Sequence, residues 1–316
     1  MEAPHLEVSG AVWLGFNAFV VALLLVDLFG FNRRAHQIKI GEALRTSAFF
    51  IAAAMFVNVL VWVRYGGHAG LTFFTGYLVE ISLSVDNLFV IAVLFGYFAV
   101  PPRYQHRVLF WGVFGAIVMR AGMILTGVAL VGRFAWVLYI FGVFLVLTGG
   151  RMLFAGNIAE PPKSNKILTY LRRVLPLTKD FHSDHFVIRK MGHVLVTPLF
   201  LVLVRIELTD VVFAFDSIPA ILGITTDPFL AYGSNIMAVV GLRALYFVLA
   251  GLIERVRYLH IGLGLVLVFI GLKMLLAERF HIPTWLSLIV ITSLIAASAL
   301  YSWYASDASE SSESGS

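Results

Sequence analysis

Long apolar segments separated by short polar ones run through almost the whole chain. Each apolar segment holds about twenty residues, the length that an α-helix needs to cross the hydrocarbon core of a bilayer. The pattern therefore predicts an all-α polytopic membrane protein with about nine spans. The predicted spans are residues 11–30, 47–64, 72–97, 108–131, 134–154, 194–222, 231–253, 258–277 and 284–304.

The composition supports this fold class and excludes several others. The chain has 316 residues, of which 60% are hydrophobic and only 13% are charged, and its mean hydropathy is +0.91. A soluble domain usually has about 25% charged residues. The sequence contains no cysteine, which excludes disulfides, thiolate catalysis and thiolate-bound metals.

Lys and Arg are distributed unevenly among the predicted loops. Alternate loops hold sixteen of these residues on one side of the membrane and three on the other. Because cytoplasmic loops carry an excess of Lys and Arg, this bias predicts an N-terminus outside and a C-terminus in the cytoplasm. We read these charges as a topology signal and expect no nucleic-acid partner.

The two hydrophobic halves of the chain resemble each other over three spans each. A unit of three spans must insert in opposite orientations in the two halves, so the pattern predicts an inverted repeat of spans 3–5 and 6–8. Inverted repeats are typical of transporters, which place their substrate site near the membrane midplane. The matching segments are 80–87 with 210–217, 142–152 with 264–274, and Arg120 with Arg243.

The repeat divides the chain into six regions. Two peripheral spans and an extracytoplasmic end precede the first repeat, a basic cytoplasmic loop separates the repeats, and a last span leads into a Ser- and Glu-rich tail that we expect to be disordered. The regions are residues 1–71, 72–154 (first repeat), 155–193 (loop), 194–277 (second repeat), 278–304 (last span) and 305–316 (tail).

Five acidic residues lie inside spans 3 and 6. Each costs roughly 2.5–3.5 kcal/mol at a helix centre on insertion scales, so these side chains must face an interior site. Pairing with the three nearby arginines would not neutralise all of them, and we therefore expect metal ligands. In order of preference, the candidate ligands are Asp86, Asp216, Glu80, Asp210 and Glu207.

Neutral donors and counter-charges accompany the acids. Asn87 and Ser217 are candidate neutral ligands, and Arg120 and Arg243 are expected to balance charge at the same depth. Asp27, at the inner end of span 1, is read as a residue at the membrane interface.

Pro219 supports two interpretations. It removes a backbone hydrogen bond to the carbonyl of Phe215, which would leave that oxygen free for a cation in a broken helix. Equally, it could only kink the end of a helix.

The candidate ligands are hard donors, that is, oxygen atoms. The set consists of carboxylate, amide, hydroxyl and carbonyl oxygens without Cys, and no His lies deep in a span. Such a set suits Mn²⁺, Mg²⁺ or Ca²⁺ and argues against Cu⁺ or Zn²⁺. We therefore expect a divalent metal ion as cargo, the lipid bilayer as surroundings and no resident cofactor.

At these residues the sequence resembles the TerC family, most closely its Alx-like bacterial members, from about Leu14 to the end of span 9. The resemblance implies an exporter of Mn²⁺ in the bacterial inner membrane, and the family's acidic residues would map onto the five acids named above. Ser82 stands where relatives are often basic, and Arg205 where an apolar residue is common. The stretches that carry the resemblance are 75–87, 207–220, 226–229, 234–235, 241–244 and 270–274.

Several alternatives accompany this prediction. Protons competing for the same carboxylates would give an exchange cycle, and Ca²⁺ could replace Mn²⁺ as cargo. A non-transporting factor that assists other membrane proteins could use the loop 155–193 for docking. An intramembrane aspartyl hydrolase built on Asp86 and Asp216 is disfavoured, because the sequence lacks a Gly-x-Gly-Asp stretch and three further acids would crowd the pair. We therefore expect no enzyme.

Overall fold

The computed structural model describes residues 6–31, 40–134, 136–154, 178, 185–190, 193–250, 259–277, 279 and 282–313. Within these residues the chain forms nine α-helices, a π-helical turn (Asp27–Phe31) and one two-stranded antiparallel hairpin, which confirms the all-α polytopic class. The helices are α1 (Gly10–Val26), α2 (Ile40–Tyr65), α3 (Gly67–Tyr97), α4 (Pro102–Arg133), α5 (Val137–Phe154), α7 (Pro198–Leu222), α8 (Pro228–Ala250), α9 (Leu259–Leu275) and α10 (Thr284–Glu313).

Seven of these helices are long and apolar enough to cross a membrane on length and composition alone. Helix α9 is apolar but shorter, because the described part begins only at Leu259. Helix α7 is excluded by its charges, since Arg205, Glu207, Asp210 and Asp216 all lie within it. Three of these four charges, Glu207, Asp210 and Asp216, are predicted metal ligands.

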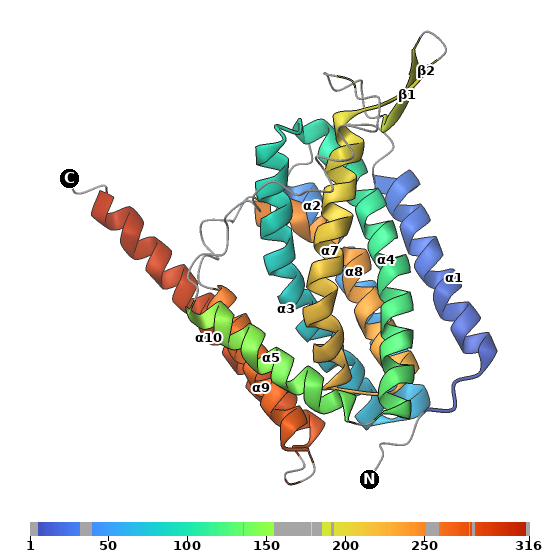
Figure 1. Ribbon diagram of the computed structural model, residues 1–316, viewed down its shortest axis with the longest axis vertical. Coiled ribbons are helices and arrows are strands. Elements are labelled where there is room, and N and C mark those ends of the chain that lie inside the picture. The colour runs from blue at the N-terminus through green and yellow to red at the C-terminus, as the bar shows by residue number, and fades with distance from the viewer. Residues whose placement is uncertain are drawn as a thin grey trace.

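Helix α8 forms the centre of the molecule. It packs against α1, α2, α3 and α4, and every residue from Phe229 to Val240 is buried. Asp227 caps its N-terminus, because one carboxylate oxygen accepts a hydrogen bond from the backbone N–H of Leu230 at 2.9 Å. Figure 1 shows α3, α4, α7 and α8 running side by side, with α5, α9 and α10 grouped obliquely beside them.

The helix boundaries have local causes. Helices α2 and α3 are separated only by Gly66, whose φ of +91° lies in the region that glycine adopts without strain. Pro102 and Pro198 stand in the first turns of α4 and α7, where the missing N–H costs nothing. Pro219 lies within α7, which continues to Leu222, so the broken-helix interpretation is wrong and the residue marks the last turn.

Helices α5 and α9 pack closely through glycines. A Cβ added at Gly149 would lie 2.5 Å from the carbonyl oxygen of Gly264, and one at Gly271 would lie 2.7 Å from that of Gly142. In the reverse direction, a Cβ added at Gly142 would lie 3.0 Å from the carbonyl oxygen of Gly271. One added at Gly264 would lie 3.0 Å from that of Gly149. The two helices are therefore antiparallel, and the missing side chains let their backbones approach.

These contacts are reciprocal in the sense of the predicted repeat, which aligns Gly142 with Gly264 and Gly149 with Gly271. A two-fold axis between equivalent units would produce this reciprocity. The inverted repeat as a whole stays a prediction.

Two sequence predictions are wrong. Residues 194–196 do not open the span predicted over 194–222 but belong to β2 (His193–Val196), which pairs with β1 (Val187–Lys190). The reason is visible in the sequence: β-branched residues flank Met191-Gly192, a short Gly-containing link typical of a hairpin. The tail was expected to be disordered from residue 305, but α10 continues to Glu313. No Gly or Pro interrupts the chain between Thr284 and Glu313, so nothing ends the helix earlier.

Candidate functional site

A buried guanidinium lies at the centre of the site. Arg120 of α4 is completely buried and forms an ion pair with Glu80 of α3. It also donates two hydrogen bonds to Asp210 of α7, from Nε to Oδ2 at 3.2 Å and from Nη2 to Oδ1 at 3.0 Å. A further bond from Nη1 reaches the hydroxyl oxygen of Ser217 at 3.3 Å. One arginine thus joins acids from two helices, and its contact with Asp210 has the bidentate geometry that orients a carboxylate.

Glu80 has further donors around it. The amide of Asn235 in α8 donates to Oε2 at 2.7 Å, and the Ser84 hydroxyl donates to Oε1 at 3.3 Å. Only 2% of Glu80 is exposed. These contacts supply hydrogen bonds that a carboxylate needs inside a protein. The site is therefore built from α3, α4, α7 and α8, and its position follows from the packing of α8 at the centre of the bundle.

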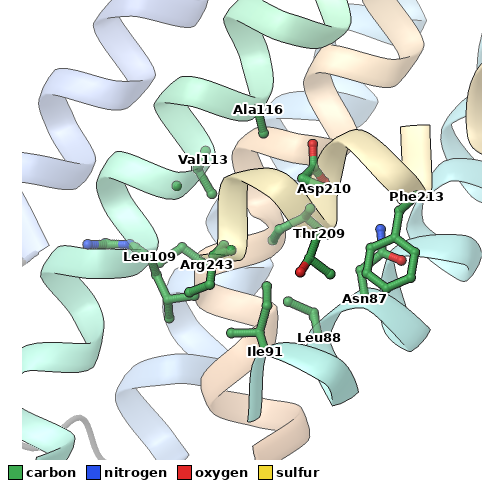
Figure 2. Close-up of a pocket in the computed structure, with 13 residues that line it drawn as sticks. Asn87, Leu88, Ile91, Leu109, Val113, Ala116, Thr209, Asp210, Phe213 and Arg243 are labelled. Atoms are coloured by element: carbon green, nitrogen blue, oxygen red, sulfur yellow. The ribbon is translucent and has the colours of Figure 1, made fainter. Parts of the chain in front are cut away.

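A cavity of about 40 Å³ adjoins Asp210. Its polar lining residues are Asn87, Thr209, Asp210 and Arg243, and Figure 2 shows how they lie around it. The Nδ2 atom of Asn87 is buried and has no hydrogen-bond partner among the described residues. Since buried amides are normally satisfied, Asn87 offers unused polar capacity to whatever enters the cavity.

Glu207 lies against α4, one helical turn before Asp210. A Cβ added at Gly115 would overlap the Glu207 carboxylate, so the glycine makes room for this side chain. The charges of Glu207 and Asp210 are near enough to repel. Among the described residues, no ion pair involves Glu207. The site therefore holds a third carboxylate with no resident cation.

The structure brings together only part of the predicted set. Glu80, Asp210, Ser217 and Arg120 are in contact, and Asn87 and Glu207 lie around them. Asp216 lies elsewhere on α7, near Thr148 of α5. Asp210 and Ser217 are seven residues apart and share a helix face, whereas Asp216 projects about 120° away from Asp210. The backbone of Asp86 belongs to α3, but its side chain lies outside the described part of the structure.

No group of three or more acids or histidines with the geometry to hold a metal occurs among the described residues. The gathering of all five acids stays a prediction, since the side chain of Asp86 lies outside the described part of the structure. Between the two carboxylates of Glu80 and Asp210, the space is occupied by Arg120.

The sequence predicts that Arg243 balances charge at the depth of the acids, and the ion pair that the described residues show for it is with a different acid. Arg243 forms an ion pair with Asp27 at the end of α1, while its stem lines the cavity beside Asp210. Figure 2 shows its guanidinium directed away from Asp210 and Asn87. Asp27 is only 3% exposed and its ion-pair partner lies within the protein, and its position at the membrane interface stays a prediction. Asp27 begins the π-helical turn that follows α1, and this irregularity is a local structural sign that the position is unusual.

Asn235 is the residue that sequence reasoning missed. It lies within α8, is completely buried and contacts Glu80 directly. Two adjacent polar residues, Ser234 and Asn235, inside an otherwise apolar span were the available signal. The Ser234 hydroxyl donates a hydrogen bond to the backbone carbonyl oxygen of Leu230 at 2.7 Å, whereas Asn235 is part of the site.

Comparison with known proteins agrees with this architecture. A membrane protein of Myxococcus xanthus, STKORF319, is 45% identical over 294 residues, which cover 93% of this chain and 92% of the relative. A protein of Shigella flexneri named as a candidate membrane-bound redox modulator, Alx, is 44% identical over 293 residues, or 90% of this chain and 92% of its own. The protein of the same name from Escherichia coli K12 is also 44% identical, over 90% and 91% of the two chains.

No solved structure matches the chain. The sequence model of the integral membrane protein TerC family matches residues 65–310. This range includes α3, α4, α7 and α8 with all the contacts of Arg120 that are described above. On this match and on the similarity of its relatives along the whole membrane region, the chain belongs to the TerC family of integral membrane proteins.

Proposed function

We propose that the protein is a secondary transporter that exports a hard divalent cation, Mn²⁺, across the bacterial inner membrane, with its N-terminus outside and its C-terminus in the cytoplasm. The observation that carries this proposal is the buried meeting of Glu80 and Asp210 from two helices beside a cavity. Carboxylates inside a membrane protein are costly and typically mark an ion pathway. Ser217 shares the Arg120 guanidinium with both carboxylates, and Asn87 and Thr209 line the cavity beside Asp210, so their oxygens are the candidate neutral donors.

The charges of the site favour a divalent cargo. Glu80, Asp210 and Glu207 carry three negative charges when ionised, and Arg120 carries one positive charge. Two negative charges remain uncompensated among these described side chains. A dication would neutralise them, and neutrality matters because an uncompensated charge is strongly unfavourable away from water.

The donors also favour a hard metal. All the side-chain ligands that the site offers are oxygens, and the chain has no cysteine. Mn²⁺, Mg²⁺ and Ca²⁺ prefer such ligands, whereas Cu⁺ and Zn²⁺ prefer sulfur or imidazole. Among the hard cations the choice of Mn²⁺ rests on the family resemblance, and Ca²⁺ is the alternative that a flux assay must compare.

The absence of cysteine also bears on the name that the Alx relatives carry. A redox role based on thiol–disulfide exchange is not available to this chain, since it has no thiol. Export of a redox-active metal ion would affect redox balance without a thiol. A role as a non-transporting factor remains the second alternative, and it predicts no flux.

Transport would proceed by alternating access. Helices α3 and α7 carry the two carboxylates and contact each other as well as α4 or α8. A relative movement of the two helix groups would expose the acid pair first to one side and then to the other. Exchange of the metal for protons stays a prediction, and transport that is insensitive to an imposed pH gradient would contradict it.

The test is Mn²⁺ flux into proteoliposomes that contain the purified full-length protein. We expect flux in the parent and none in Asp210→Asn or Glu80→Gln, which preserve shape and remove one charge each. Glu7→Gln is the matched control, because Glu7 is exposed and lies outside the bundle core. An inactive parent that unfolds cooperatively and also fails to transport Ca²⁺ or Mg²⁺ would refute the proposal. A hydrolase built on Asp86 and Asp216 would instead tolerate both substitutions.

A further inference from the structure

We propose that Arg120 is a resident substitute for the transported cation, which the metal must displace, and that Glu207 receives the displaced guanidinium. This inference rests on the proposed function and assigns different roles to residues that would otherwise count together as a metal site. It separates Glu80 and Asp210, which bind metal, from Glu207, which binds Arg120 when the metal is present.

The first step of the argument is occupancy. The guanidinium of Arg120 contacts an oxygen of Glu80, both oxygens of Asp210 and the hydroxyl of Ser217. These oxygens are the hard ligands that a divalent cation would use. Arg120 is completely buried and remains protonated under all ordinary conditions, so it cannot leave the site by losing its charge. A metal ion can reach both carboxylates only if the guanidinium moves.

The second step is the need for an acceptor. A guanidinium displaced by a metal would be a buried charge without a partner, which is strongly unfavourable. Glu207 is the nearby carboxylate that lacks an ion pair within the described residues. It sits on the helix that carries Asp210, three residues earlier, and packs on the helix that carries Arg120, at Gly115. Helical side chains lean toward the N-terminus of their helix, and Gly115 lies five residues in that direction from Arg120, about 7.5 Å along the axis and about 140° around it.

The third step is charge. With the metal on Glu80 and Asp210, and Arg120 on Glu207, each carboxylate has a cation and the four side chains plus metal are neutral. With the metal gone, Arg120 returns between Glu80 and Asp210 and prevents two bare carboxylates from facing each other. The arrangement explains why Gly115 leaves space for an acid that contacts no cation in the present state.

Metal binding to purified protein tests the two roles through a double-mutant cycle. Binding of ⁵⁴Mn²⁺ to the full chain in detergent is measured for the parent, Arg120→Gln, Glu207→Gln and the double variant. Arg120→Gln removes the competitor and should tighten binding at least about tenfold, since each 1.4 kcal/mol corresponds to a factor of ten. Glu207→Gln should weaken binding by a similar factor in the parent and by less than about twofold in the Arg120→Gln background.

The outcomes separate the inference from the function on which it rests. If Arg120→Gln leaves Mn²⁺ binding unchanged or weaker, Arg120 is not a competitor and the inference fails while the transporter stands. If Glu207→Gln weakens binding equally in both backgrounds, Glu207 is a metal ligand and its proposed role fails. If the parent binds no Mn²⁺, Ca²⁺ or Mg²⁺, the proposed function itself fails.

Folding is controlled in the same samples. Glu7→Gln removes an exposed carboxylate outside the bundle core and should leave Mn²⁺ affinity within twofold of the parent. Should Arg120→Gln not fold without metal, Arg120→Lys keeps the charge but loses the bidentate contact, and it should bind Mn²⁺ more tightly than the parent. Equal or weaker binding by Arg120→Lys would overturn the inference.

Discussion

The predicted repeat aligns Arg120 with Arg243, but the two arginines have different partners in the structure. Arg120 joins Glu80 of α3 to Asp210 of α7, so it belongs to contacts between the two proposed repeat members. Arg243 pairs with Asp27, the first residue of the π-helical turn after α1, which lies outside both members. The first arginine has more acids around it than it can neutralise, whereas the ion pair of the second, as the described residues show it, joins one base to one acid.

This difference shows which buried charges are free to serve a function. A buried pair of one acid and one base is a closed unit, and replacing both members by apolar or neutral residues is often tolerated. A cluster with two acids, one base and a third acid nearby leaves a net negative charge that a cation can satisfy. Equivalent sequence positions thus do not imply equivalent roles, because the partner comes from a different helix.

The largest predicted contrast comes from removing each pair as a whole. Glu80→Gln/Arg120→Met takes away one charge of each sign and should abolish Mn²⁺ flux, because Glu80 supplies metal ligands. Asp27→Asn/Arg243→Met makes the same change in the other pair and should keep at least about half of the flux, as expected for a pair that is replaceable. The measurement is Mn²⁺ uptake by proteoliposomes with matched protein content. Equal loss in both double variants would show that the two pairs are not different in kind.

The single substitution Arg243→Met should cost stability. It leaves Asp27 buried without its cation, and breaking a buried pair on one side costs about 3–5 kcal/mol. Adding Asp27→Asn should recover most of this loss, since the two effects are coupled through one contact. Thermal unfolding in detergent with a fluorescence readout checks both steps. A double variant as unstable as the single one would mean that Arg243 stabilises the fold through contacts other than Asp27.

The comparison also separates what the sequence could predict from what it could not. The long apolar segments predict most of the helices, because the bilayer fixes the length and composition of a span. The shared face of Asp210 and Ser217 also followed from helical spacing, and both contact Arg120. These features are local, and local periodicity determines them.

The partners of buried charges are not local. Asp27 and Arg243 are 216 residues apart in the chain, and the sequence around each residue does not indicate that the two form a pair. The same holds for Asn235, which reaches Glu80 across 155 residues. The hairpin β1–β2 was missed for another reason, because the high hydropathy of residues 194–196 was assigned to the following span. A period of two over four residues is a weak signal beside an apolar segment of twenty.

Substitutions of the glycines between α5 and α9 test whether the two halves of the predicted repeat make equivalent contacts. Gly149→Ala and Gly271→Ala both place a Cβ against a backbone oxygen, at 2.5 and 2.7 Å, and should each cost about 1–3 kcal/mol. Gly142→Ala and Gly264→Ala meet the same kind of oxygen at 3.0 Å and should cost less. Gly150→Ala, with nothing within 4 Å of the added atom, is the control and should not destabilise the protein. Thermal unfolding measures all five, and unequal effects of the Gly149 and Gly271 variants would contradict the equivalence.

The smallest predicted effect concerns Gly115, where the two halves differ again. The predicted repeat aligns Gly115 of α4 with Ala238 of α8, so the second half has a Cβ at the corresponding position. In α4 the added methyl group of Gly115→Ala would meet the Glu207 carboxylate, the flexible end of a side chain that can move aside. The fold should therefore survive, while Glu207 is displaced from the helix that carries Arg120.

We expect Gly115→Ala to lower Mn²⁺ affinity by a factor of a few, less than the roughly tenfold change that 1.4 kcal/mol produces. Gly122→Ala lies on the same helix with nothing within 4 Å of the added atom, and it should bind Mn²⁺ like the parent. In the Arg120→Gln background the effect of Gly115→Ala should disappear, because no guanidinium is then left for Glu207 to receive. An undiminished effect in that background would mean that Gly115 shapes the metal site itself, and the contrast between Glu207 and the two metal-binding carboxylates would be lost.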